Sequence, residues 1–176
     1  MISHQIKVDF IMKNKSLYIG MFISFLTIFG SLEIFESKGW KLSYEQQAYL
    51  RCLPIEWSIT TEEKITPSEV VRGMLVVVKT DEYEQFYRKG ATLLKLIVGI
   101  PGDKVNFDSG RITINDQFIA EYRVGEDEEF KPFSSGKFIL KDGEYWISGS
   151  TRVSLDSRYI GPVSLDQIIG KGYAII

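Results

Sequence analysis

The sequence predicts a mainly β protein, with one N-terminal transmembrane helix followed by a domain of antiparallel β-sheets. Two observations support this prediction. The run from Ser16 to Leu32 carries no charge, and the rest of the chain alternates short apolar runs with turn residues. Helical periodicity is scarce beyond the first run, so βαβ units are not expected. We therefore expect a cytoplasmic N-terminus at 1–15, a transmembrane anchor at 16–35 and an extracytoplasmic β-rich domain at 40–176.

The composition excludes several classes of function. A net charge of -2 gives the chain no strongly basic surface for nucleic acid. The chain has 1 cysteine and 1 histidine, Cys52 and His4. An intrachain disulfide and cysteine-rich metal sites are therefore excluded, and histidine-dependent catalysis would depend on a residue next to the N-terminus. We expect no bound metal and no cofactor.

The uncharged run is at the short end of the roughly 17–25 residues that cross a bilayer, and continuing it to Phe35 approaches a ~30 Å hydrocarbon core. A buried core helix is disfavoured because no polar face recurs at helical spacing. A cleaved signal sequence is disfavoured because bulky and charged residues follow the run. Lysines at 7, 13 and 15 slightly outnumber Lys38 and Lys41, which favours a cytoplasmic N-terminus.

The remaining elements are expected to be short strands. Asp108-Ser109-Gly110 predicts one hairpin, and Asn115-Asp116, which tolerate positive φ, predict a second one. A single helical turn is expected at Leu165–Ile169, and the acidic segment Gly125–Phe130 is expected to be a solvated loop. The expected strands are Gly73–Thr80, Leu93–Ile100, Lys104–Phe107, Arg111–Ile114, Gln117–Ala120, Lys137–Leu140, Glu144–Ser148 and Gly172–Ile176.

A cysteine nucleophile with a lysine base is chemistry that needs no histidine. Pro54 fixes its own φ and restricts Leu53, so Cys52 is expected on a stiff, strand-like segment. Lys95 stands among apolar residues of an expected strand, where poor solvation disfavours the ammonium ion. The alternatives are a buried structural cysteine and a lysine whose amino group reaches water.

The chain resembles type I signal peptidases, and most of all the TraF-like pilin peptidases of conjugative transfer. Four blocks carry the resemblance below the anchor. They are Cys52-Leu53-Pro54, Arg72–Val77, Lys95–Asp103 and Ser154–Gly161. The resemblance implies a signal-peptidase-like domain of antiparallel β-sheets.

The resemblance also implies a role for each matching residue. Cys52 would attack the peptide carbonyl, Lys95 would take the thiol proton and Ser154 would orient the lysine. Asp156 and Arg158 would brace the site, and in an extended segment their side chains would point the same way. Pro54 would support the nucleophile.

This chain departs from the family in five places. The usual nucleophile is serine, and Leu50 occupies a position where relatives often carry an oxyanion-binding hydroxyl. Met74 follows Arg-Gly in place of Asp, Leu96 follows Lys95 in place of Arg, and Ser150-Thr151 stand in place of Asp-Asn. A thiol needs less help from a base than a hydroxyl does. The oxyanion would depend on backbone N–H groups, including that of Cys52.

The predicted function is that of a peptidase in the bacterial inner membrane, with its catalytic domain in the periplasm. Its expected substrate is a precursor pilin or another exported protein of a conjugative, type IV secretion apparatus, cut after small residues. Two alternatives stay open. A catalytically silent relative would bind pilin during assembly, and an acyl transferase would cyclise pilin by resolving the acyl-enzyme with an amine. The sequence predicts no nucleic-acid partner and no oligomeric state.

Overall fold

The structure, a computed structural model, describes residues 15–44, 52–80, 89–122, 131–152 and 154–175. The chain divides into two compact units, the second of which runs from Trp40 to Ile176. His4, Leu50 and the expected acidic loop at 125–130 lie outside the described residues.

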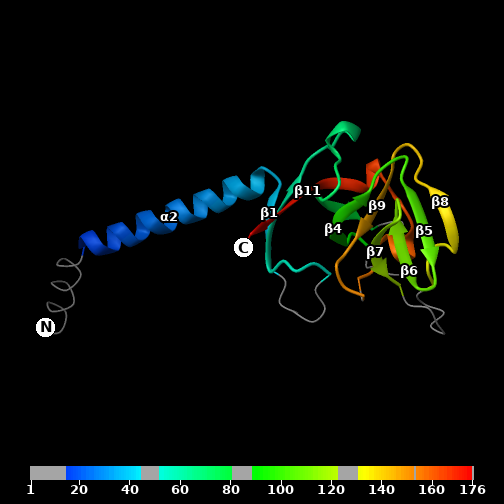
Figure 1. Cartoon of the computed structure of the whole chain (residues 1–176). Coiled ribbons are helices and arrows are strands. Elements are labelled where there is room, and N and C mark those ends of the chain that lie inside the picture. The colour runs from blue at the N-terminus through cyan, green and yellow to red at the C-terminus, as the bar shows by residue number, and fades with distance from the viewer. Residues whose placement is uncertain (1–14, 45–51, 81–88, 123–130, 153, 176) are drawn as a thin grey trace, which may run out of the picture. The chain divides into compact units, whose positions relative to one another are not determined.

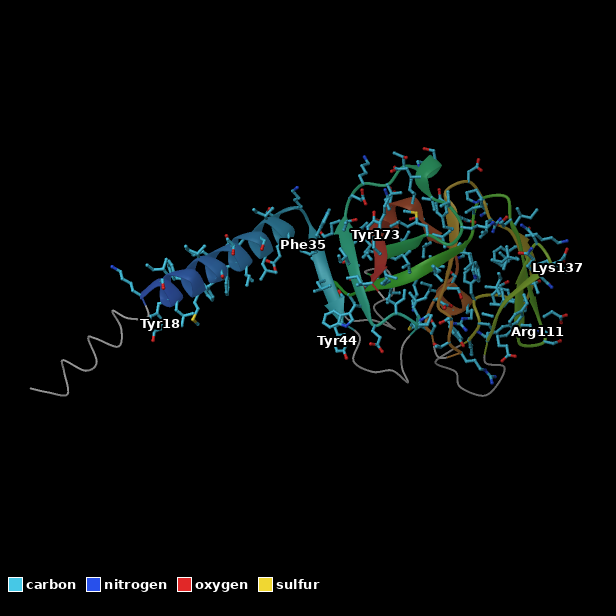
Figure 2. All side chains as sticks on the ribbon, turned by 60° about the vertical axis from the view of Figure 1, so that its left-hand side comes forward. Tyr18, Phe35, Tyr44, Arg111, Lys137 and Tyr173 are labelled. Carbon is cyan, nitrogen blue, oxygen red and sulfur yellow. The ribbon has the colours of Figure 1, made fainter. Side chains whose placement is uncertain are left out.

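Helix α2 spans Lys15–Ser37, two residues beyond the expected C-terminal bound. At 1.5 Å per residue, its 23 residues measure about 34 Å, enough to cross a bilayer. None of its residues is buried, and Figure 2 shows its side chains projecting all around the ribbon. Within the described residues it is the one helix with the length and composition of a membrane span.

The second unit contains two antiparallel sheets (Figure 1). The larger sheet has the order β1-β2-β11-β3-β4-β9-β10, and the smaller one has the order β7-β6-β5-β8. The strands are β1 (Trp40–Tyr44), β2 (Trp57–Glu62), β3 (Leu75–Lys79), β4 (Thr92–Gly99), β5 (Lys104–Asp108), β6 (Arg111–Ile114), β7 (Gln117–Glu121), β8 (Gly136–Ile139), β9 (Glu144–Ser148), β10 (Val163–Ser164) and β11 (Ile168–Ile175). Short helical turns are η1 (Pro67–Glu69), α3 (Ser157–Ile160) and η4 (Leu165–Gln167).

Strand β9 contributes side chains to two hydrophobic cores. Its side chains alternate, so Tyr145 and Ile147 enter the core under the large sheet while Trp146 enters the core of the small sheet. Gly99 of β4 lies against Trp146, and a Cβ there would stand 2.8 Å from the Trp146 Cβ. Burial on both faces explains why this segment of β9 reads as a continuous apolar run.

The turn after β4 fixes the end of that strand. The Asp103 carboxylate, 5% exposed, accepts hydrogen bonds from the Ile100 N–H and the Asn115 amide at 2.8 Å each, and from the Arg72 guanidinium. Burial alone would raise the pKa of Asp103, but these donors hold it below its ordinary value. Arg72 also donates to the Val98 carbonyl at 2.9 Å, so the Arg72 block and the Lys95–Asp103 block brace each other.

Both expected hairpins are confirmed. Strands β5 and β6 pair across the Asp108–Gly110 turn, and β6 pairs with β7 across Asn115 and Asp116, which have φ of 48° and 66°. Each of the remaining expected strands contains or overlaps an observed one. Two strands linked by Lys141–Gly143, β8 and β9, belong to different sheets.

Four expectations need correction or completion. The segment Cys52–Pro54 forms a bend and not a strand. The stretch from Asp156 to Arg158 is not a strand, because Asp156 caps the helical turn α3, to which Arg158 belongs. The turn expected at Leu165–Ile169 ends at Gln167, since β11 begins at Ile168. Strands β1, β2 and β10 were not predicted from the sequence.

Candidate active site

Lys95 is a buried amine in the middle of β4. It pairs with Val76 of β3, and its side chain is 2% exposed. Its Nζ donates a hydrogen bond to the Ser154 Oγ at 2.8 Å. Within the described residues no carboxylate forms an ion pair with it. The Ser154 hydroxyl, and not a carboxylate of the described residues, therefore sets the direction of this amine.

Ser154 is held in place by a buried ion pair that follows it in the chain. Arg158 Nη2 lies 2.7 Å from Asp156 Oδ2, with the two side chains 1% and 0% exposed. Arg158 also donates to the carbonyl oxygens of Ser154, Thr151 and Glu121 at 3.1, 2.8 and 2.8 Å. Burial alone would lower the pKa of Arg158, but the hydrogen bond and charge of Asp156 raise it above its ordinary value.

The helical turn α3 explains why Asp156 and Arg158 meet. Asp156 is the N-cap, and its carboxylate accepts a hydrogen bond from the Arg158 N–H. The Arg158 Nε donates to the same carboxylate at 2.8 Å. Ser157 accepts a hydrogen bond from the Ile147 N–H at 2.9 Å, which ties the turn to β9. The two side chains are therefore joined by capping of a turn, and not by alternation along a strand.

Cys52 lies on the bend before β2 and is half-buried. Its carbonyl oxygen accepts a hydrogen bond from the Ser150 N–H at 2.6 Å. Gly149 stands beside the same oxygen and beside Ser154. A Cβ at Gly149 would lie 2.6 Å from the Cys52 oxygen and 2.2 Å from the Ser154 Oγ. The site thus requires glycine at position 149, a constraint that the sequence analysis did not predict.

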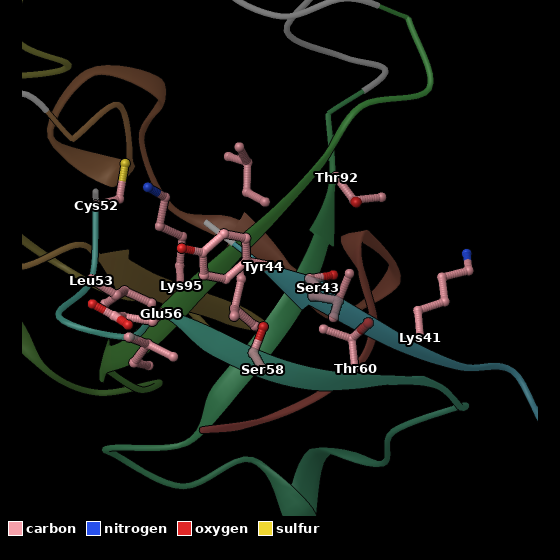
Figure 3. Close-up of a pocket in the computed structure, with 14 residues that line it drawn as sticks. Lys41, Ser43, Tyr44, Cys52, Leu53, Glu56, Ser58, Thr60, Thr92 and Lys95 are labelled. Carbon is pink, nitrogen blue, oxygen red and sulfur yellow. The ribbon is translucent and has the colours of Figure 1, made fainter. Parts of the chain in front are cut away.

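One pocket of about 360 Å³ contains both Cys52 and Lys95 in its lining. Figure 3 shows the sulfur of Cys52 and the amino group of Lys95 at the same end of the pocket. Lys41 and Thr92 lie at the other end (Figure 3). The full lining is Lys41, Ser43, Tyr44, Cys52, Leu53, Ile55, Glu56, Ser58, Thr60, Val77, Thr92, Leu93, Leu94 and Lys95.

The predicted site residues thus fall into two groups. Cys52, Lys95, Ser154, Asp156 and Arg158 are linked through the pocket or through hydrogen bonds. Pro54 is exposed and is not part of the pocket lining. In the parts of the chain that the structure describes, no three His, Cys, Asp or Glu side chains gather where they would hold a metal ion.

Comparison with known proteins places the chain in a family. The family model "Signal peptidase, peptidase S26" matches residues 15–176. The chain is similar to signal peptidase I V of Bacillus subtilis, with 29% identity over 90 residues, which are 44% of this chain and 54% of the relative. It is also similar to signal peptidase IB of Staphylococcus aureus, with 30% identity over 99 residues, covering 47% and 52%. The match spans about half the length of each relative.

A solved structure is also similar. It is the crystal structure of a signal peptidase I from Enterococcus faecalis, with a TM-score of 0.40 and 21% identity, covering 58% of this chain and 96% of that chain. The family model covers the apolar helix, both sheets and every block that surrounds Lys95. The chain therefore belongs to the signal peptidase, peptidase S26, family, whose members are peptidases.

Proposed function

We propose that this protein is a membrane-anchored endopeptidase that cleaves an exported precursor protein, with Cys52 as nucleophile and Lys95 as general base. The observation that carries the proposal is the buried Lys95 amine, hydrogen-bonded to Ser154 at 2.8 Å in a pocket that Cys52 also lines. A nucleophile beside a base whose orientation is fixed by a third group is the arrangement of covalent acyl-transfer catalysis.

In the proposed mechanism, Lys95 takes the proton of the Cys52 thiol as the sulfur attacks the carbonyl carbon of the scissile peptide. Backbone N–H groups, including that of Cys52, stabilise the negative oxygen of the tetrahedral intermediate. The C–N bond then breaks, and Lys95 returns the proton to the leaving amine. Water, deprotonated by Lys95, hydrolyses the thioester and restores the thiol.

The open edge of β4 supports an extended peptide as the substrate. The Thr80 N–H donates to the Ala91 oxygen, and the Ile97 N–H donates to the Met74 oxygen. Because hydrogen-bonded pairs alternate along antiparallel strands, the odd-numbered residues of β4 direct their backbone N–H and C=O groups toward β3. Thr92 and Leu94 therefore direct theirs to the opposite edge, where pairing with β9 begins at Leu96. Within the described residues no strand occupies this edge beside Thr92 and Leu94, and a substrate strand added there would lead its scissile bond to Lys95.

The finer proposal is that the substrate is a precursor pilin, or another exported protein, of a conjugative type IV secretion system. Its support is the resemblance of the Cys52-Leu53-Pro54 block to transfer peptidases of the TraF-like branch. Mass spectrometry of a candidate pilin after incubation with the protein tests it. A new free terminus indicates hydrolysis, a closed ring indicates acyl transfer to an amine, and an unchanged mass indicates a binding protein that does not cleave.

Replacing Lys95 by arginine is expected to lower the rate of precursor cleavage at least about 100-fold, because arginine keeps the charge but does not release its proton. The Lys95→Met variant, uncharged and similar in length, is expected to lose the same activity while its melting temperature reports on folding. Lys104→Arg, an exposed lysine of β5, is the matched control. Cleavage within threefold of wild type by the folded Lys95→Arg variant would remove Lys95 from the mechanism.

We also propose that α2 anchors the protein in the bacterial inner membrane with residues from Trp40 onward in the periplasm. The slight excess of lysine before the uncharged run that starts at Ser16 supports this orientation. Exposed Trp40 and Tyr44 follow soon after the helix, and such residues favour a membrane interface.

The protein is therefore expected to stay in the membrane fraction after carbonate washing. Protease added to spheroplasts should digest residues beyond 40 without lysis of the cells, with a cytoplasmic protein as the control for intact membranes. Recovery of a soluble protein trimmed at its N-terminus would contradict the anchor.

A further inference from the structure

We propose that Ser150 is a positioning residue that sets the direction of the Cys52 thiol; this inference rests on the proposed role of Cys52 as nucleophile. Ser150 approaches the carbonyl oxygen of Cys52 with two donors. Its N–H lies 2.6 Å from that oxygen, and its Oγ lies 3.2 Å from it. Ser150 is exposed, and Cys52 is part of a bend. This contact therefore joins the nucleophile to the rest of the site through residues that belong to neither sheet.

Control of this carbonyl controls the thiol. The peptide unit is planar, so two donors on its oxygen restrain rotation of the whole Cys52–Leu53 peptide and with it ψ of Cys52. The direction of the Cys52 Cα–Cβ bond then follows relative to the Lys95 amine, which Ser154 holds independently. A sulfur displaced by about 1 Å from its attack position reduces the rate substantially even when binding is unchanged.

Ser150 is itself fixed by the buried part of the site. The preceding residue, Gly149, donates its N–H to the Asp156 carboxylate at 2.7 Å, and Asp156 is held by Arg158. The backbone of Gly149 fits between Ser154 and the Cys52 oxygen with no space for a side chain. The Asp156–Arg158 pair therefore positions Gly149 and Ser150, and Ser150 in turn contacts the carbonyl oxygen of the nucleophile.

The test compares Ser150→Ala, which loses the hydroxyl and keeps the N–H, with Ser150→Thr, which keeps both donors. Ser135→Ala, an exposed serine before β8, is the control. For each full-length protein we would measure kcat, KM and the melting temperature. The rate of alkylation by iodoacetamide would be measured as well, and it reports on Cys52 alone because the chain has 1 cysteine.

Ser150→Ala is expected to lower kcat about three- to tenfold, the effect of one neutral hydrogen bond, with KM changed less than twofold. The melting temperature should stay within about 2 °C of wild type, as for an exposed serine. Alkylation of Cys52 should become roughly threefold faster, because a carbonyl held by one donor instead of two gives the bend more freedom. Ser150→Thr should restore both rates to within twofold, and Ser135→Ala should change neither.

An unchanged alkylation rate in Ser150→Ala would overturn the inference, and so would an unchanged kcat. A threonine variant as impaired as the alanine variant, or a kcat that falls only in step with the melting temperature, would also overturn it. If the wild-type protein cleaves no precursor, the proposed function fails. The alkylation rates then decide the inference by themselves, because they need neither substrate nor turnover.

Discussion

Cys52→Ala is expected to abolish precursor cleavage completely, the largest effect on activity of any single substitution proposed for this protein. Without the sulfur no acyl-enzyme forms, and Lys95 has no thiol to deprotonate. Cys52 is half-buried on a bend, so removal of its sulfur should leave the melting temperature nearly unchanged. The measurement is precursor processing in cells that carry wild type or the variant at equal protein levels.

Cys52→Ser is the matched variant for this test, because it keeps the size and the position of the nucleophile. It is expected to retain a small fraction of the activity, since a hydroxyl requires a stronger base and better stabilisation of the oxyanion than a thiol does. Treatment of wild type with a thiol-alkylating reagent should reproduce the alanine result. Normal maturation of the precursor by Cys52→Ala would defeat the enzymatic proposal and leave a protein that binds its partner without cleaving it.

Arg158→Ala is expected to give the largest loss of stability, about 3–5 kcal/mol, because it leaves the Asp156 carboxylate buried without its positively charged partner. The same change removes the donors to the carbonyl oxygens of Ser154, Thr151 and Glu121. Activity is expected to fall together with stability, because Ser154 and Gly149 both depend on this pair for their positions. Chemical denaturation measures the change in the free energy of unfolding.

Two variants separate this effect from neighbouring ones. Arg152, whose side chain is 74% exposed and lies 3.2 Å from Glu121, is the matched control, and Arg152→Ala should change the free energy of unfolding by less than about 0.5 kcal/mol. Ser154→Ala should lower activity with a smaller loss of stability, because its hydroxyl orients Lys95. Equal losses of stability in Arg158→Ala and Ser154→Ala, with activity following stability in both, would argue against a separate orienting role for Ser154.

Local patterns were sufficient to predict the helix and the hairpins. The uncharged run after Lys15 has no polar face, and a helix that is apolar on all sides needs an apolar environment whatever the rest of the chain does. The turns at Ser109-Gly110 and Asn115-Asp116 have positive φ at all four residues. Gly, Asn and Asp tolerate positive φ, so the turn positions can be read from neighbours in the sequence.

Strands β1 and β2 could not be predicted in this way. All five residues of β1 are exposed, and its sequence, WKLSY, gives no one-sided burial pattern. Its strand conformation depends on pairing with β2, and β2 in turn pairs with β11 from the far end of the chain. A segment stabilised by a partner so distant in sequence carries little local signal of its own.

The sequence by itself determined which residue types are present for chemistry: one thiol, a lysine in an apolar strand, and an Asp156-Ser157-Arg158 segment after Ser154. Tertiary structure alone decided how they meet. The Lys95–Ser154 and Ser150–Cys52 hydrogen bonds join residues 59 and 98 positions apart in the chain, and the Ser154 hydroxyl and the Cys52 oxygen limit the space at Gly149. The physical reason is that the sequence specifies each side chain but not the distances between remote residues. Those distances depend on strand order, the bend at Cys52 and the capped turn at Asp156, which form only when the two sheets pack.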